Sequence, residues 1–349
     1  MGKSIVGVDI GSASVRAVEV EGGRRPRPIV TRFHEIALPE GAVKNGEVVE
    51  INTVATILKQ LWSVAGFTTR NVVLGVGNAK VLVRDLTVPK VSRREIKAAL
   101  PFQVQDMLPV PVADALLDFY PYAEKAAENG TEVTGLLIAA VKDAVMANVT
   151  AVQLAGLNPV EVDLIPFALN RVSVRGGGAS GTVALVDVGA NTTNVAITRD
   201  GVPQFVRIIP AGGSDVTRAL AGRLGISTDQ AEIGKRSLGL APKTVAPEHV
   251  EAAGIVYELT SELLNSLRNT LSFYMNSRQG QHIERVVLSG GGASMTSFAN
   301  ALSELTRIPV IMEDPFGTVT VSKNAQKSTR PAPTSGMTVA LGLALGSVA

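Results

Sequence analysis

The sequence predicts an α/β protein built from two homologous halves. The chain has 349 residues, which is more than one ordinary hydrophobic core accommodates and fits two domains of common size. Two segments about half the chain apart, 5–20 and 183–197, repeat one pattern of strand, turn and strand. The glycine-rich stretch Arg175–Gly181 lies between them. Because the repeat opens each half, we expect domain 1 over residues 1–175 and domain 2 over residues 176–349.

The composition is that of a foldable globular chain, with 46% hydrophobic and 18% charged residues. Lys and Arg total 33 against 31 Asp and Glu, and the two signs are mixed, so we expect no nucleic-acid-binding face. The chain has no cysteine, and its three histidines lack metal-ligand spacing, which excludes thiolate zinc sites and disfavours histidine-based ones. No apolar run reaches the roughly 20 residues of a membrane span. Asp9 interrupts the first apolar run, which argues against a signal peptide.

In the first half, the periodicity predicts three strands, a helix and two further strands. The helix carries Val54, Leu58 and Leu61 on one face, and Gly66 marks its end. The expected bounds, in order, are 5–10, 15–20, 29–33, 53–65, 71–76 and 81–87.

An inserted subdomain is expected at about residues 86–158. Ser92 followed by Glu95 is a capping box that opens a helix. Strands, a helix and a last strand complete the half, at 115–120, 135–141, 142–155 and 160–164. In the second half, a smaller part at about 224–284 follows the repeated hairpin.

The repeat itself carries residues suited to holding a polyphosphate. Each copy has Asp, then glycine two positions later, then small hydroxyl or amide residues, beginning at Asp9 and Asp187. Glycine lets backbone N–H groups approach phosphate oxygens, and an Asp at the end of each strand suits a Mg²⁺ shell reached through water. We therefore assign both Asp residues as candidate metal-facing and catalytic residues that position Mg²⁺ and water. The candidate phosphate contacts are Gly11, Ser12, Ala13, Ser14, Gly189, Asn191, Thr192 and Thr193.

One such hairpin alone would be an ordinary turn, whereas two copies that each open a half favour a binding site. Gly290, Gly291 and Gly292 follow a buried strand and precede a helix, where bare backbone suits an adenosine. A helix opened by Ser227 presents Glu232, Lys235 and Arg236 on one face. Alone they indicate a solvated face, but between the hairpin and the glycines they are candidate nucleoside contacts. No Walker-type P-loop is present.

The order of these motifs resembles the superfamily of actin, sugar kinases and heat-shock chaperones over nearly the whole chain. The resemblance implies an actin-like ATPase fold, with two duplicated RNase H-like domains around a nucleotide cleft. It also implies ATP and Mg²⁺ as cofactors. Within it, Gly336–Leu345 matches the second connecting helix, and Glu232–Arg236 resembles the nucleoside-contacting helix of the chaperones.

The sequence is more closely similar to the PilM family of actin-like proteins of type IV pilus assembly. The matching segments are Asp9–Glu19, the start of the insertion at Leu86–Lys90, Asp314–Gly317, and Pro210–Thr217. The last segment adds Gly212 and Gly213 to the candidate cofactor contacts. The insertion is similar to the 1C subdomain that this family shares with FtsA.

This resemblance implies a cytoplasmic, ATP-binding scaffold at the inner-membrane face. Its expected partner is the N-terminal cytoplasmic tail of a bitopic, PilN-like membrane protein, bound in the cleft near residues 88–111 between domain 1 and the insertion. Contacts with pilus motor ATPases and self-association stay open. Membrane attachment is expected only through the partner, because the chain ends at Ala349 without an amphipathic helix.

Two departures from the family pattern bear on catalysis. The family usually carries Lys where Arg16 stands, and Leu164–Phe167 is apolar where actin places a water-positioning polar residue. Asp163 and Glu161 are nearby alternatives. We therefore expect nucleotide binding with at most slow hydrolysis. An FtsA-like filament protein is the alternative function, and a small-molecule kinase is a weaker one because no catalytic carboxylate or polar substrate pocket follows the first hairpin.

Overall fold

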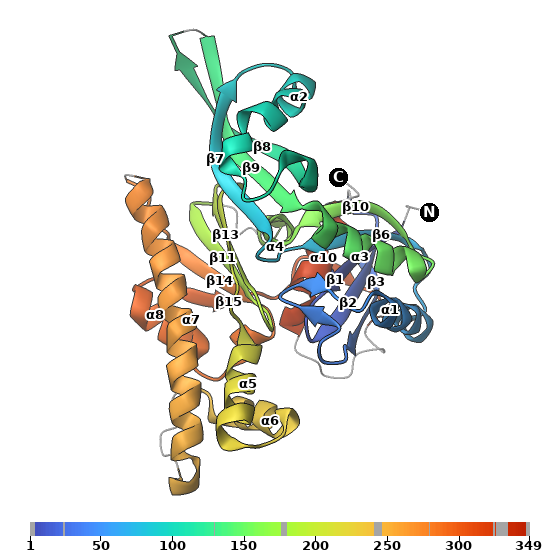
Figure 1. Ribbon diagram of the computed structural model, residues 1–349, viewed down its shortest axis with the longest axis vertical. Helices are drawn as coiled ribbons and strands as arrows, with labels where there is room; N and C mark the ends of the chain where they lie inside the picture. The colour runs from blue at the N-terminus through green and yellow to red at the C-terminus, as the bar shows by residue number, and fades with distance from the viewer. Residues whose placement is uncertain are drawn as a thin grey trace.

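The computed structural model has two main β-sheets, one in each half of the chain, flanked by helices (Figure 1). The structure describes residues 4–23, 25–128, 130–175, 180–240, 246–278, 280–323, 325 and 334–346. Within these ranges, no helix combines the length and apolarity needed to cross a membrane.

The first sheet has six strands in the order β10-β6-β1-β2-β3-β16. Strands β1 to β3 pair antiparallel with their neighbours, whereas β6 and β10 join in parallel. The short β16 comes from the second half of the chain and pairs with β3. The bounds are Ser4–Ile10 (β1), Ser14–Glu21 (β2), Ile29–Ala37 (β3), Asn71–Val76 (β6), Asn158–Leu164 (β10) and Thr320–Val321 (β16).

The second sheet repeats this topology in the order β13-β12-β11-β14-β15. Its first three strands are antiparallel neighbours and its last two join in parallel, as in the first sheet. The hairpin β11–β12 thus occupies the place of β1–β2, and the predicted duplication is confirmed. The bounds are Thr182–Val188 (β11), Thr193–Arg199 (β12), Val202–Ile209 (β13), Arg285–Ser289 (β14) and Val310–Met312 (β15).

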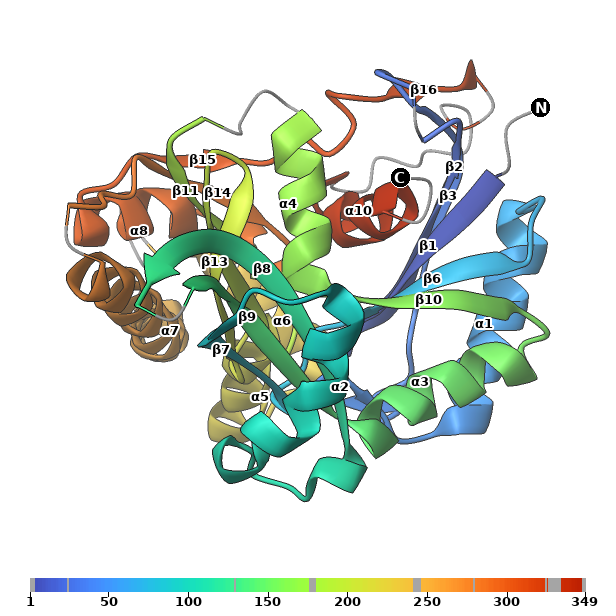
Figure 2. The same ribbon diagram turned by 90° about the horizontal axis from the view of Figure 1, so that it is seen from above.

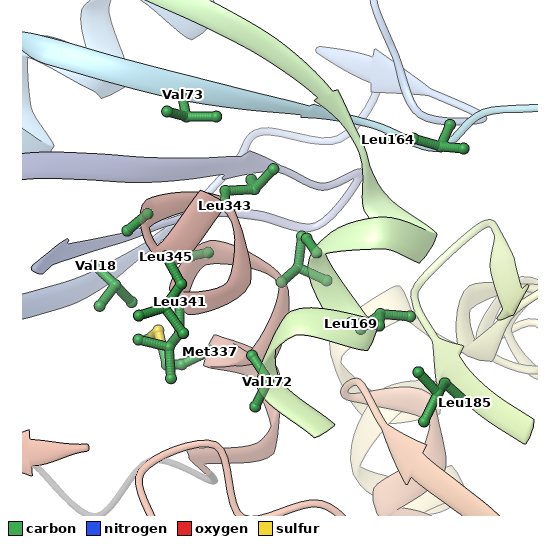
Figure 3. Packing of buried hydrophobic residues seen from close by; sticks show 14 of the residues in the cluster. Val18, Val73, Leu164, Leu169, Val172, Leu185, Met337, Leu341, Leu343 and Leu345 are labelled. Carbon is green, nitrogen blue, oxygen red and sulfur yellow. The ribbon is translucent and has the colours of Figure 1, made fainter. Parts of the chain in front are cut away.

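Two helices lie between the sheets, α4 (Ile165–Arg175) and α10 (Thr338–Gly346) (Figure 2). Their apolar side chains meet inward-facing residues of both sheets in one core (Figure 3). The packing is close: a Cβ atom at Gly7 would lie 1.9 Å from the Ala340 carbonyl oxygen, and one at Gly342 would lie 2.1 Å from that of Ala168. The predicted C-terminal helix is therefore buried, and it packs tightly against β1 and α4 of the first half.

Other helices cover the outer faces of the two sheets. Alternate residues of β1, such as Val6 and Val8, pack against α1 (Ile51–Ala65) and α3 (Lys142–Leu154). The second sheet packs against α7 (Val250–Ser277) and α8 (Phe298–Thr306). A small cluster unites α5 (Gly213–Leu224), α6 (Thr228–Leu238) and the first turns of α7.

The inserted unit is a three-stranded antiparallel sheet in the order β7-β9-β8, with a helix, α2, on it. The predicted capping box of Ser92 and Glu95 is present at the start of α2. The expected range of about 86–158 also includes α3, but this helix covers the first sheet, and the insertion begins earlier than expected, with β7 at Val81. The short pair β4–β5 completes the strands. Bounds are Val43–Lys44 (β4), Glu47–Val48 (β5), Val81–Pro89 (β7), Arg93–Gln103 (α2), Ala115–Ala127 (β8) and Gly130–Val141 (β9).

Candidate nucleotide-binding site

Both hairpin turns close in the same way and leave backbone donors available. The Gly11 N–H donates to the Ser14 carbonyl at 3.0 Å, and the Gly189 N–H donates to the Thr192 carbonyl at 2.9 Å. In the part of the chain that the structure describes, the N–H groups of Ser12 and Ala13 have no hydrogen-bond partner. N–H groups at such a turn can donate hydrogen bonds to phosphate oxygens.

A row of charged side chains crosses the first sheet beside its hairpin turn. Asp9, Arg16 and Glu35 are direct cross-strand neighbours on β1, β2 and β3. Arg16 Nη1 lies 3.6 Å from Asp9 Oδ2, and Arg16 Nε donates to Glu35 Oε1 at 2.9 Å. The Ser14 hydroxyl donates to the same Glu35 oxygen at 2.6 Å. The row therefore places one guanidinium between two carboxylates.

The carboxylates of the two hairpins lie within electrostatic reach of one another. Burial raises the pKa of Asp9 to about 6, which the Arg16 charge opposes and the Asp187 charge reinforces. Burial also raises the pKa of Asp187, while the hydrogen bond from Ser289 and the Arg16 charge lower it. The Ser289 hydroxyl donates to Asp187 Oδ1 at 2.9 Å. The structure thus brings the two predicted aspartates together.

The second hairpin carries an amide where the first carries the guanidinium. Asn194 is the cross-strand neighbour of Asp187, as Arg16 is of Asp9. Among the described residues, Asn194 Oδ1 is buried and accepts no hydrogen bond. A Cβ atom at Gly77 would lie 2.6 Å from this oxygen, so Gly77 leaves room beside it. An unpaired buried acceptor is costly, and a metal-bound water would satisfy it.

The segment that starts α5 is tied to the second hairpin by its backbone. The Gly213 N–H donates to the Gly189 carbonyl at 3.0 Å, and the Ser214 N–H donates to the Ala190 carbonyl at 2.7 Å. A Cβ atom at Gly212 would lie 2.6 Å from both carbonyl oxygens. The predicted Gly212 and Gly213 therefore adjoin the second predicted phosphate turn.

The glycine run after β14 lies against the same hairpin. Gly290 has a φ of +89°, and a Cβ atom there would lie 2.3 Å from the Val188 carbonyl oxygen. A Cβ atom at Gly292 would lie 2.6 Å from a Val188 methyl group, whereas one at Gly291 would meet no atom within 4 Å. The backbone at Gly291 is therefore open to close approach by a ligand.

The predicted nucleoside-contacting residues of α6 form an ion-paired network. Lys235 is 8% exposed, and its Nζ donates to the Gly213 carbonyl at 3.1 Å, to Thr217 Oγ1 at 2.9 Å and to Glu232 Oε2 at 2.6 Å. Burial would raise the pKa of Glu232, but the hydrogen bonds from Lys235, Thr217 and Arg236 lower it to about 2. Lys235 thus holds α6 to α5 at Gly213, and the exposed Arg236 lies at the edge.

A cavity of about 180 Å³ adjoins these glycines between α5, α7 and the turn after β14. Its walls include the predicted Gly212, Gly213 and Gly292. It does not include Glu232, Lys235 or Arg236. The sequence analysis did not assign its remaining walls to the site. They come largely from α5 and α7, and they are Val188, Ala211, Asp215, Val216, Leu259, Thr260, Glu262, Leu263, Ser266, Met295 and Phe298.

The sequence analysis also missed Glu35, Asn194, Ser289 and Thr217. Glu35 lies outside the motifs, whereas Asn194 lies within the repeated segment 183–197, Thr217 ends the segment Pro210–Thr217, and Ser289 directly precedes the glycine run. Each contacts a predicted residue on another strand or helix, and a linear motif does not show such a contact. The proposed water-positioning alternatives lie elsewhere: Asp163 is paired with Arg171 of α4 at 2.5 Å, and Glu161 is exposed on the edge strand β10.

The donor set suits a divalent cation held with a nucleotide. Within the described ranges, no group of three or more histidine or carboxylate side chains is placed to hold a metal by itself. Mg²⁺ keeps several waters and is usually held by one or two carboxylates plus phosphates. Asp9 and Asp187, with the unpaired Asn194 oxygen nearby, fit that arrangement.

A second cavity, of about 410 Å³, opens at the base of the insertion. It is lined by the start of β7, the end of β9 and the loop before β8. We define these residues as the basal groove: Ala79, Lys80, Val81, Leu82, Leu108, Pro109, Val110, Ala115, Ala139, Ala140 and Val141.

One arginine joins the insertion to the second domain. Arg278, at the end of α7, donates from Nη2 to both carboxylate oxygens of Asp85 at 3.1 and 3.0 Å. The same nitrogen donates to Tyr122 Oη at 3.0 Å and to the Gln204 carbonyl at 2.9 Å. Asp85 and Tyr122 belong to the insertion, whereas Gln204 lies on β13. We call this set the Arg278 bridge.

Comparisons with known proteins agree with this architecture. The sequence matches the family model of the type IV pilus assembly protein PilM over residues 7–348. The structure is similar to that of a PilM–PilN type IV pilus biogenesis complex, with a TM-score of 0.84, 27% identity, and coverage of 99% of this chain and 98% of that one. FtsA of Bacillus subtilis (strain 168), a cell division protein, is 25% identical over 322 residues, which cover 80% of this chain and 72% of FtsA. MreB 5 of Spiroplasma citri bound to AMPPNP has a TM-score of 0.54 at 11% identity, with coverage of 98% and 95%.

Proposed function

This chain belongs to the PilM family of type IV pilus assembly proteins, and on that premise we propose that it is an ATP-binding scaffold that holds a PilN-like membrane partner. The family match confirms the predicted resemblance, and the similar structures confirm the predicted actin-like ATPase fold. Nucleotide binding, the metal, the partner and its site are the proposed part.

One observation supports nucleotide binding above the others: the second hairpin turn, the start of α5 and the glycine run meet around Gly189, and Asp9 of the first hairpin lies within electrostatic reach of Asp187. These segments are far apart in sequence, and each offers backbone groups without a covering side chain. Ordinary turns have no reason to converge in this way. In the proposed complex, the phosphates lie between the turns and the nucleoside lies toward the glycine run and α6.

Asp9 and Asp187 are the proposed residues that face Mg²⁺ through water, where the ion neutralises phosphate charge. They are also the two candidate catalytic residues. Turnover is proposed to be slow at most, because Asp163 is paired with Arg171 and Leu164–Phe167 supplies no polar side chain to position water. The site then serves as a conformational control rather than as a metabolic enzyme.

The basal groove is the proposed site for the N-terminal cytoplasmic tail of the PilN-like partner. It overlaps the expected cleft near residues 88–111 at Leu108, Pro109 and Val110, and its walls are mostly apolar, which suits a short peptide. The similar PilM–PilN complex supports a partner of this kind. Attachment to the inner membrane would then run through the partner, with this chain in the cytoplasm.

The Arg278 bridge supports a coupling between nucleotide and partner. Nucleotide binding would fix the two halves relative to one another, and the bridge ties the insertion to the second half. The insertion is covalently part of the first half, so relative motion of the halves would act on the basal groove. Such coupling is a shift between populations of two conformations.

The direct test is calorimetric titration of ATP–Mg²⁺ into the wild type and into Asp187→Ala. Saturable binding that is lost in the variant is expected, because the variant removes a carboxylate proposed to face the metal. Thermal unfolding of both proteins without nucleotide is the control for folding. A wild type that binds no nucleotide would overturn the ATP-binding part of the proposal.

The partner is tested by titrating a synthetic peptide of its cytoplasmic tail into wild type and Val110→Asp. The variant places a charge in the basal groove and should weaken peptide binding at least tenfold. Val64→Asp is the matched control, because Val64 is an exposed valine of α1 outside the groove and outside residues 88–111. Equal peptide affinity in all three proteins would place the partner elsewhere.

The similarity to FtsA keeps a second function open, self-association into filaments. Sedimentation with and without ATP–Mg²⁺ tests it. Large assemblies in the absence of any partner would favour this alternative.

A further inference from the structure

The Arg16 guanidinium is held by a carboxylate, Glu35, that lies outside every sequence motif. The row Asp9–Arg16–Glu35 lies at one level of three adjacent strands, directly beside the first phosphate turn. We propose that Glu35 is a positioning residue that holds the Arg16 guanidinium in place for the terminal phosphates of a bound nucleotide. This inference rests on the proposed nucleotide-binding function and deepens it.

Glu35 contacts the Arg16 guanidinium through its Nε atom. Its Oε1 accepts from Arg16 Nε at 2.9 Å, and the same oxygen accepts from Ser14 Oγ at 2.6 Å. Ser14 is buried at the turn, so the carboxylate is fixed from two sides. A guanidinium anchored through Nε holds its plane in one orientation, so its terminal nitrogens are directed at a second acceptor.

The terminal nitrogens of Arg16 are left without a close acceptor among the described residues. Nη1 lies 3.6 Å from Asp9, which is beyond an ordinary hydrogen bond, and in the described ranges Nη2 has no partner. The Arg16 charge acts on both Asp9 and Asp187, so the guanidinium is within electrostatic reach of the carboxylates of both hairpins. A phosphate there would accept from the terminal nitrogens while Glu35 keeps Nε.

The second half of the chain lacks an equivalent of this pair. The matching cross-strand row there is Asp187, Asn194 and Ile208. In the proposed phosphate site, the guanidinium of this cross-strand row therefore comes from the first half. The second half has no matching cation in that row, so the residue that anchors Arg16 has a larger effect on phosphate binding.

A positioning role of Glu35 and a simple effect of its charge predict opposite changes in ATP affinity when Glu35 is removed. Glu35 carries a negative charge near the proposed phosphate site, so its removal alone should tighten binding of an anion. Loss of positioning should instead weaken binding, because the guanidinium becomes mobile. Glu35→Ala removes both charge and acceptor, whereas Glu35→Gln removes the charge and keeps an oxygen for Arg16 Nε.

The test titrates ATP–Mg²⁺ into wild type, Glu35→Ala, Glu35→Gln and Arg16→Ala, and into the double variant with both alanines. Glu35→Ala should weaken binding about tenfold and Glu35→Gln should stay within about threefold of wild type. In the Arg16→Ala background, Glu35→Ala should have no further effect. Glu40→Ala, which removes an exposed carboxylate of the same domain, is the matched control.

A second readout needs no nucleotide. The ¹⁵Nε signal of Arg16, assigned by its absence in Arg16→Lys, should show slow proton exchange in wild type and Glu35→Gln and fast exchange in Glu35→Ala. Affinity in Glu35→Ala equal to or tighter than wild type would overturn the inference alone. A wild type that binds no nucleotide would overturn the proposed function together with it.

Discussion

The ionisation of Asp9 depends on the fold around it. Burial against the second hairpin raises its pKa from the ordinary 3.8 to about 6. Between these values the folded protein holds a proton that the unfolded chain has released. The free energy of unfolding therefore falls as pH rises from about 4 to about 6, and this contribution is constant above that range.

We predict that the Asp9→Asn substitution abolishes this loss of stability between about pH 4 and pH 6. The variant should gain stability relative to wild type across pH 4 to 6, by up to roughly 3 kcal/mol, and the difference should stay level above pH 6. Urea unfolding of both proteins at several pH values measures it. A stability difference that does not change with pH would mean that Asp9 titrates normally.

The same titration bears on the proposed metal site. Mg²⁺ favours the ionised carboxylate, so ATP–Mg²⁺ affinity should fall as pH drops below about 6. Calorimetry in two buffers of different ionisation enthalpy at pH 5.5 should detect proton release on binding. Affinity that is level from pH 5 to pH 8 would count against Asp9 in the metal shell.

At the scale of elements, α10 packs closely against α4 and β1 of the first half. A Cβ atom at Gly342 would lie 2.1 Å from the Ala168 carbonyl oxygen, so even alanine must push the helices apart. Gly342→Ala should lower the free energy of unfolding by about 1–3 kcal/mol.

Gly222, in the last turn of α5, provides the matched control. It is exposed, and a Cβ atom there would meet nothing within 4 Å. Gly222→Ala should therefore raise stability by about 0.5–1 kcal/mol, through helix propensity alone. Denaturant unfolding compares the two variants, and equal effects would contradict the close approach at Gly342.

The Arg278 bridge makes a prediction about coupling. Arg278→Ala should leave ATP–Mg²⁺ and peptide binding each measurable, but ATP should no longer change peptide affinity. Arg223→Ala, which removes an exposed ion pair with Glu258 within the second domain, should leave coupling intact. Peptide titrations with and without ATP–Mg²⁺ test both. Undiminished coupling in Arg278→Ala would show that the signal travels by another path.

At the scale of the molecule, much of the topology was predictable because the same sequence pattern occurs once in each half. Each half begins with the same local pattern, a strand, an Asp-x-Gly turn and a second strand. Its repetition predicts two similar sheets without any knowledge of tertiary packing. The capping box of Ser92 and the buried C-terminal helix were predictable for the same local reason.

Side-chain contacts between different elements were not predictable. The pairing of Arg16 with Glu35 depends on the register of β2 and β3, which a bulge between Glu19 and Val20 shifts. The cavity walls on α7 and the Arg278 bridge depend on tertiary packing that no linear pattern records. Amphipathic periodicity likewise could not assign α3 to the first sheet, because it shows an apolar face and not its partner.

The most direct test of the central claim is thermodynamic linkage between the two proposed sites. Affinity of the partner's cytoplasmic peptide is measured with and without ATP–Mg²⁺, and affinity of ATP–Mg²⁺ is measured with and without the peptide. A nucleotide-controlled scaffold predicts that both ligands bind and that each changes the other's affinity by the same factor, about fivefold or more. Two binding events that leave each other's affinities unchanged would contradict it.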